Sequence, residues 1–287
     1  MLSLPPPARD SSSSVSKDEE RGGKPVISMA EDEDTLRHLL ILCYPAFLPA
    51  LDNMDELSLT IRVAQKFELP CASSIMKYRL LALASTAPER AYALGWIIQS
   101  KEVVHLAAKE SLARPLLDIS PQPEFAQIPE SAVFELLAYH RLCLRSVSSI
   151  ATSLEWLRPA SLPAAVLQWQ NVADADNTGR CNCNSGLVSV ILAGGVELWI
   201  KTWCKTYLET AVGELQSCVR GSTVKQFKTL RNAVVNNVGN CTTCKANCYE
   251  ALDKISDLLV EQVERVITKT SLKHLSELVA RPISRPP

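Results

Sequence analysis

Apolar residues recur at the spacing of an α-helix along almost the whole chain, and this pattern constrains the fold more than any other feature. Leu36, Leu39 and Cys43 stand at positions i, i+3 and i+7, which places them on one stripe of a helix. The same spacing returns in the segments 57–67, 72–83, 91–98, 104–112, 133–144, 196–207 and 252–266. We therefore predict a mainly α protein, a bundle-like array of helices. We expect 91–98 and 104–112 to form a helical hairpin, and 196–207 to pack on 252–266.

Strand character is confined to one short segment, 25–29 (PVISM), which is rich in β-branched residues. The acidic run at 31–34 follows it and suits the N-terminus of a helix. Before it, 8–24 combines a serine run, mixed charge and a glycine pair without any aromatic residue, which is typical of a solvated loop. We expect 8–24 to be disordered and one or two short strands to lie at the N-terminal side.

The charge balance excludes some classes of partner. The chain has 30 Lys and Arg against 31 Asp and Glu, so the overall field of a dedicated binder of nucleic acid or anionic membrane is absent. The longest weakly polar stretch, 187–196, is about half as long as the roughly 20 residues that a membrane-spanning helix needs. The first residues, MLSLPPP, lack the pattern of a secretory signal. We expect a cytoplasmic or nuclear protein with no membrane span and no specific nucleic-acid partner.

Three features follow one another near the N-terminus: Val26 and Ile27 in the strand, a leucine-rich helix ending at Tyr44, and the sequence VAQKFEL at 63–69. Their order resembles the C-terminal half of a BTB/POZ domain. The segments 88–119 and 131–143 are similar to the helical extension that follows this domain in the BTB proteins of mushroom-forming fungi. The stretch 241–266 is similar to a closing segment of the same proteins.

This resemblance and the loop-rich composition of 158–180 divide the chain into four parts. They are the C-terminal half of a BTB/POZ domain with a remnant of its sheet (1–84), a helical extension (85–157), a loop-rich connection (158–180) and a cysteine-containing C-terminal helical unit (181–287). The hairpin and helix that supply most of the BTB dimer interface have no counterpart here. We therefore expect the sequence to begin inside the domain, and the oligomeric state stays open.

Two close pairs of cysteines offer a metal site, Cys181 with Cys183 and Cys241 with Cys244. Four thiolates complete the tetrahedral shell of a structural zinc ion, which would stabilise the C-terminal unit. Cys248 lies four residues after Cys244 and is an alternative ligand if this segment is helical. Packed free thiols are a second interpretation, because buried cysteine behaves as a small apolar side chain. A disulfide is the third, and no other cofactor is expected.

Catalytic constellations are not evident. His38, His105, His140 and His274 each stand alone, and Cys143, three residues after His140, lacks a third group to activate it. Gly194 and Gly195 are not surrounded by a phosphate-loop motif. Trp199 and Trp203 stand at i and i+4, which suits either a helix core or a partner-binding face. We expect a protein that is not an enzyme.

The resemblance implies a non-enzymatic protein–protein interaction module, an adaptor or scaffold of the BTB type. Its partners would be other proteins, in a cullin-type ubiquitin ligase or a regulatory complex. The hydrophobic-x-Glu feature of some cullin-binding BTB proteins is not matched by Val15, Ser16 and Lys17. The alternative is a zinc-stabilised regulatory protein associated with transcription.

Overall fold

The computed structural model describes residues 20–21, 23–26, 31–43, 51–167, 187–226, 228–231, 234, 238 and 242–270. The α-helices are α1 (Glu33–Cys43), α2 (Met54–Lys66), α3 (Pro70–Leu83), α4 (Pro88–Ile97), α5 (Lys101–Ser111), α6 (Glu130–Thr152), α7 (Thr202–Ser217), α8 (Gly221–Val224) and α10 (Thr242–Lys269). The strands are β1 (Glu20–Arg21), β2 (Lys24–Pro25), β3 (Leu187–Ile191) and β4 (Glu197–Lys201), which form two antiparallel pairs. The predicted mainly helical fold is confirmed.

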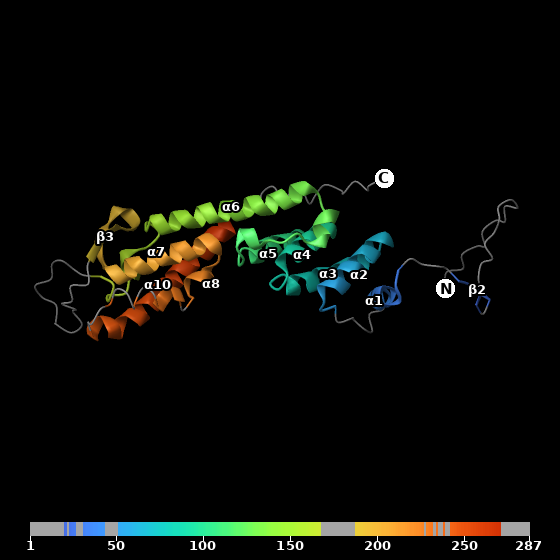
Figure 1. Cartoon of the computed structure of the whole chain (residues 1–287), viewed down its shortest axis with the longest axis horizontal. Coiled ribbons are helices and arrows are strands. Elements are labelled where there is room, and N and C mark those ends of the chain that lie inside the picture. The colour runs from blue at the N-terminus through green and yellow to red at the C-terminus, as the bar shows by residue number, and fades with distance from the viewer. Residues whose placement is uncertain are drawn as a thin grey trace, which may run out of the picture.

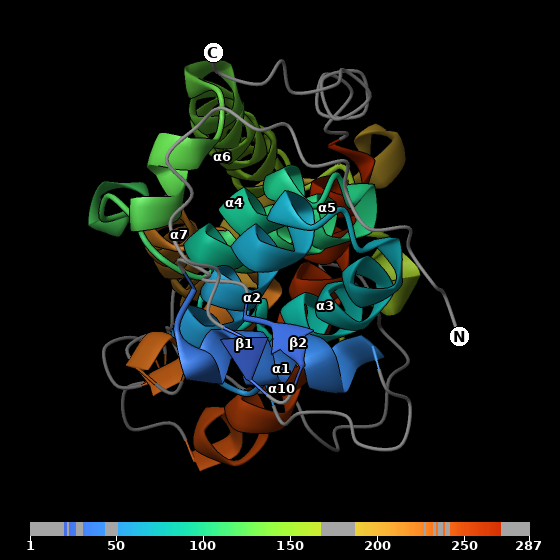
Figure 2. The ribbon, with the colours of Figure 1, turned by 90° about the vertical axis from the view of Figure 1, so that its right-hand side faces the viewer.

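The molecule is elongated, with helices gathered at two ends (Figure 1). Helices α1 to α5 lie toward one end, and α7, α8, α10 and β3 lie toward the other. The long helix α6 runs above both groups, and Figure 2 shows the same arrangement viewed along the length of the molecule. The Tyr92 hydroxyl of α4 donates a 2.8 Å hydrogen bond to the Ala132 carbonyl near the start of α6, which joins α6 to the first group.

Local sequence signals explain where several helices begin. The Asn53 side chain accepts a hydrogen bond from the Asp55 amide at 2.8 Å and so caps the N-terminus of α2. Ser100 caps α5 in the same way through the Val103 amide. Pro70 and Pro88 occupy the first positions of α3 and α4, where the missing N–H costs no helical hydrogen bond.

The predicted hairpin of 91–98 and 104–112 is confirmed as α4 and α5. A side chain at Gly95 would have no room, because a Cβ atom there would lie 2.8 Å from Cγ1 of Val103. The two backbones therefore approach closely at this glycine. Fully buried alanines on the facing stripes, Ala91, Ala107 and Ala108, extend the close packing.

At the other end, α6, α7 and α10 converge on one small apolar cavity of about 10 Å³. Val147 of α6, Leu208 of α7 and Leu259 of α10 are among the residues that line it. Of the stripe predicted at 196–207, Trp203 and Tyr207 lie in α7 and are buried. The next residue, Leu208, lines this cavity together with Leu259 of α10 and residues of α6. This three-helix core positions the surface described below.

The structure corrects the expectation of disorder throughout 8–24. Glu20 and Arg21 pair with Pro25 and Lys24 across a tight turn that contains Gly23 at a φ of 72°. Gly23 explains this turn, because glycine adopts positive φ without steric cost and so helps to close a short hairpin. The predicted strand 25–29 includes Pro25 of β2, whereas Val26 follows the strand and 27–29 lie outside the described residues.

A second correction concerns 196–207, which we predicted as one helical stripe. Residues 197–201 form β4, which pairs with β3, and the helix begins only at Thr202. Gly194 and Gly195, at φ 76° and 74°, make the connection between the strands. Positive φ at two successive residues terminates any helix and favours a hairpin. Up to residue 167, the expected loop-rich connection contains the short 3-10 turn Pro159–Ser161 and a single bridge from Leu167 to Ile200, and 168–180 lie outside the described part.

Candidate functional site

Most of the predicted zinc ligands fall outside the described part of the chain, namely Cys181, Cys183 and Cys241. Cys244 and Cys248 are both buried in α10. Burial raises the pKa of the Cys248 thiol, and its sulfur lies 3.7 Å from the Lys245 carbonyl oxygen. Within the described ranges, no three His, Cys, Asp or Glu residues gather as a metal site would require. The zinc prediction stays a prediction, and Cys248 occupies the position expected of a packed thiol.

The histidines and tryptophans separate into core and surface positions. His105 is exposed on α5, His274 lies outside the described residues, and the same holds for the side chain of His38. Trp203 is buried in α7, while Trp199 is exposed on β4. The two tryptophans therefore share no helical face, because the strand ends between them.

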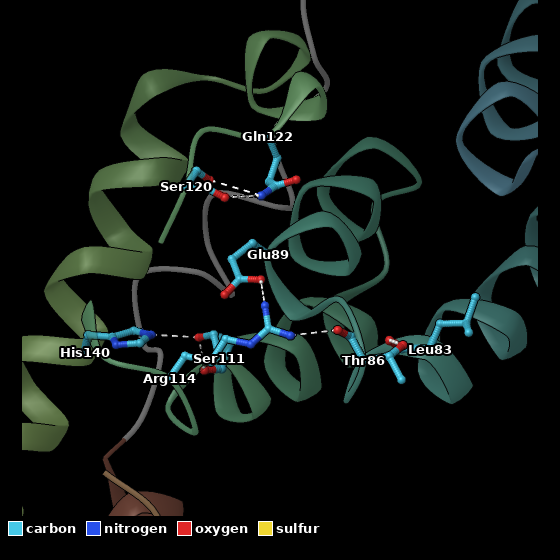
Figure 3. A network of polar contacts seen from close by, with 9 residues as sticks. Leu83, Thr86, Glu89, Ser111, Arg114, Ser120, Gln122 and His140 are labelled. Carbon is cyan, nitrogen blue, oxygen red and sulfur yellow. Dashed lines mark hydrogen bonds and ion pairs between the residues drawn. The ribbon is translucent and has the colours of Figure 1, made fainter. Parts of the chain in front are cut away.

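His140 has a partner that sequence reasoning missed. Its Nε2 atom lies 2.7 Å from the hydroxyl oxygen of Ser111, which is 29 residues away on α5 (Figure 3). The same hydroxyl lies 2.8 Å from the Ala108 carbonyl oxygen, and the tautomer of the His140 ring decides whether Nε2 donates to Ser111 or accepts from it. Burial lowers the pKa of His140 to about 4, so the ring is neutral.

The Ser111–His140 pair contains a hydroxyl and an imidazole, as a catalytic nucleophile and base would, but its geometry supports a structural role. The Ser111 hydroxyl is shared between the imidazole and a backbone carbonyl of its own helix. Both side chains are buried. The pair therefore fixes α5 against α6.

Arg114, just after the end of α5, donates hydrogen bonds to polar groups near the start of α4. Arg114 donates to the Glu89 carboxylate at 3.1 Å and to the Thr86 carbonyl at 2.7 Å (Figure 3). Glu89 is itself 3% exposed, so its charge needs this partner. The contact holds the turn between α3 and α4.

A charge network joins the two groups of helices. The Arg220 side chain bonds to Glu110 Oε1 at 3.3 Å and to the Lys109 carbonyl at 3.1 Å. Lys109 Nζ lies 2.9 Å from Glu264 Oε2, and the Gly221 amide donates to Glu264 Oε1 at 3.0 Å. Burial alone raises the pKa of Glu264, but the bonds from Lys109 and Gly221 and the charge of Arg220 lower it overall.

A groove with exposed apolar side chains near it lies beside the β3–β4 hairpin. A groove of about 640 Å³ opens between β3, one face of α7 and the segment that follows α6. We call it the hairpin groove. Its lining residues are Ser153, Leu154, Glu155, Ser189, Val190, Ile191, Lys205, Leu208, Glu209 and Val212.

Apolar side chains of the hairpin next to this groove face solvent. Ile191 is 60% exposed, Val196 43% and Trp199 37%. Exposed apolar residues that cluster beside a groove with charged members are typical of a protein-binding surface. The sequence analysis named Trp199 as a candidate for a partner-binding face, but it placed this residue on a helix, whereas Trp199 lies on β4.

A second groove of about 520 Å³ lies where α2 and α4 end. Glu68 and Gln99, which line it, both have positive φ, of 54° and 55°. Each follows the last turn of its helix, in the position where a residue commonly turns left-handed to end a helix. These conformations are explained by helix termination, so we do not assign a function to this groove.

No helix in the described part of the chain has the length and apolarity that a membrane span requires. Comparison with models of protein families, with curated proteins and with solved structures found no match. A functional assignment therefore rests on the residues and geometry of the chain itself.

Proposed function

We propose that the chain is a non-enzymatic protein–protein interaction module, an adaptor or scaffold that receives a partner protein in the hairpin groove. One observation carries this proposal: the groove of about 640 Å³ is lined by the exposed Ile191 of β3, and the paired strand β4 carries the exposed Trp199. Tryptophan and other large apolar residues contribute much of the energy at protein interfaces. Partner binding would remove this apolar surface from water.

The proposal includes an adaptor of the BTB type, in which the N-terminal helices join a cullin-type ubiquitin ligase or a regulatory complex. Its support is the order of the BTB-like features over 26–69. The elongated shape adds to it, because α1 to α3 lie at the opposite end from β3 (Figure 1). One end would join the assembly while the other end holds the recruited protein.

The interior position of the Ser111–His140 pair supports a role without catalysis. Ser111 is fully buried and His140 is 4% exposed, so a substrate would have no access to the hydroxyl without opening the interface of α5 and α6. The pair is therefore available for packing and not for acyl transfer.

Affinity capture tests the proposal. The tagged full chain is used to recover proteins from extract of its own cells under reducing conditions, with recovered proteins identified by mass spectrometry. The groove variant carries Glu155→Lys and Ile191→Lys, and Phe134→Lys is the control because Phe134 is 66% exposed on α6, away from the groove and from α1 to α3. We expect the partner held in the groove to be recovered with the wild type and the control and lost with the groove variant, whereas proteins bound by the N-terminal helices should be recovered with all three.

The identity of the recovered proteins distinguishes the versions of the proposal. Cullin or ligase subunits would support the ubiquitin-ligase adaptor, and chromatin proteins would support a regulatory complex. Equal recovery of every protein by all three chains, or recovery of chaperones alone, would contradict an interaction module built on this groove.

A further inference from the structure

The backbone of β3 presents hydrogen-bonding groups toward the hairpin groove. The Leu192 amide donates to the Val196 carbonyl at 2.9 Å, and Val190 lies opposite Leu198 in the register. Because hydrogen-bonded and non-hydrogen-bonded pairs alternate along an antiparallel ladder, Val190 bonds to β4 and its neighbours Ser189 and Ile191 do not. The amide and carbonyl of Ser189 therefore point away from β4.

The two outer edges of the hairpin differ. On β4, the Lys201 amide donates to the Val166 carbonyl at 3.0 Å, and Ile200 forms a bridge with Leu167, so another segment covers that edge. On β3, Leu154 forms a bridge with Leu192 just beyond the end of the strand. Among the residues that the structure describes, β4 is the strand that pairs with Leu187–Ile191, and no second one does.

The groove follows the part of the β3 edge that pairs with no second strand among the described residues. Three consecutive residues of β3, Ser189 to Ile191, line it, and since their side chains alternate between the two faces, the groove runs along the edge and not over one face. The opposite wall comes from α7 at the helical spacing 205, 208, 209 and 212. A chain that paired with β3 would thus lie between the strand and α7.

The side chains of the groove specify the chemistry of such a chain. Leu154, Val190, Leu208 and Val212 offer apolar contacts. Two carboxylates, Glu155 and Glu209, and one ammonium group, that of Lys205, line the groove, and Lys205 Nζ lies 3.7 Å from Glu209 Oε1. The groove therefore carries an excess of negative charge, centred on the exposed Glu155.

We infer that the hairpin groove binds an extended, basic segment of a partner protein, which adds as a further strand to the edge of β3 that lines the groove. Its backbone would bond to the amide and carbonyl of Ser189, its alternate apolar side chains would contact Leu208 and Val212, and a Lys or Arg would pair with Glu155. Main-chain bonds give such strand addition its affinity, and alternate side chains give specificity. This inference rests on the proposed function and names the class of partner.

Synthetic decapeptides test the inference on the full chain. One set alternates Val or Leu with Lys or Thr, and a matched set has the same composition with apolar residues at helical spacing. Each alternating peptide is also made with a single N-methyl group at each position in turn. We expect the alternating set to bind at least tenfold more tightly than the matched set. N-methylation should weaken binding at least tenfold at every second position, because only every second amide faces β3.

Two variants separate the contributions of charge and side chain. Glu155→Lys should weaken the alternating peptides at least tenfold, whereas Ser189→Ala should leave their affinity within about twofold because the contact uses its backbone. Equal binding of both peptide sets, no binding of either, or an N-methyl effect without a two-residue period would overturn strand addition. A concentration-dependent dimer of the chain that excludes the peptides would also overturn it, since a second copy would then occupy the edge.

The outcome is distinguishable from failure of the proposed function. If partners recovered from extract still depend on Glu155 and Ile191 but the peptides do not bind with the expected period, the interaction module stands and strand addition is wrong. If recovery does not depend on these residues, the proposed function itself fails.

Discussion

The guanidinium of Arg220 lies 3.3 Å from Glu110, although 110 residues separate the two in the sequence. Beside it, the Val219 amide donates to the Leu112 carbonyl at 3.0 Å. These two contacts hold the turn between α7 and α8 against the C-terminal end of α5. This contact, together with α6, couples the groove-bearing end of the molecule to the helices at the other end.

Replacing Arg220 should weaken the whole fold. Arg220→Met removes the arginine partner of the partly buried Glu110 and one of the three partners of Glu264, and we expect the free energy of unfolding to fall by about 2 kcal/mol. Urea unfolding followed by circular dichroism measures this. Arg265→Met is the control, because Arg265 pairs with Glu261 on the exposed face of α10 and should change stability by less than about 0.5 kcal/mol. Equal effects of the two variants would show that the network does not couple the two ends.

Acidification should destabilise the protein through His140. Its pKa is about 4 in the folded state against 6.5 ordinarily, so between these values the unfolded chain binds more protons. Stability from the neutral ring is complete above pH 6.5 and is lost as pH falls toward 4, by about 3 kcal/mol. Urea unfolding at several pH values measures this slope, and His140→Gln should remove most of it. A variant that keeps the full slope would contradict the assignment.

The same substitution should have opposite effects at two glycines. Gly95→Ala places a methyl group 2.8 Å from Val103 Cγ1 and should lower the free energy of unfolding by about 1–3 kcal/mol. Gly213 lies on the exposed side of α7 with no described atom within 4 Å of an added Cβ, so Gly213→Ala should raise stability by about 1 kcal/mol. Thermal unfolding of both variants checks the signs, and a stabilising Gly95→Ala would contradict the close approach of α4 and α5.

The zinc alternative is tested by metal content. If Cys181, Cys183, Cys241 and Cys244 form a structural site, protein purified in mild reductant should carry about one equivalent of zinc by mass spectrometry. Cys241→Ser should lose it, while Cys143→Ser, which changes a buried thiol of α6, should retain it. Less than a tenth of an equivalent in the wild type would leave packed free thiols as the interpretation.

Helical periodicity predicted most of the fold because a single helix records its buried face in local spacing. Ala91 and Leu94, or Ala107 and Ala108, are buried as their spacing indicated. The prediction of a helix through Val196 and Ile200 was wrong because apolar residues four apart fit both the helical period and the two-residue period of a strand. The glycine pair at 194–195 was the available signal for a hairpin.

The functional surface was harder to predict because it depends on contacts between distant segments. Ser153 to Glu155, β3 and α7 line one groove, yet they are spread over 60 residues of sequence between Ser153 and Val212. The Ser111–His140 bond likewise joins two helices whose pairing no local pattern records. Sequence reasoning identified each residue type but not its neighbour.

Site-specific photo-cross-linking tests the central claim most directly. A photoreactive amino acid is placed at Ile191 in the hairpin groove or at Phe134 on α6, which are both well exposed, and cross-linked proteins are identified by mass spectrometry after irradiation of the cells. We predict partner proteins cross-linked from position 191 and not from 134, with the cross-links lost when Glu155→Lys is added. The same proteins from both positions, or none from position 191, would contradict a binding role for the hairpin groove.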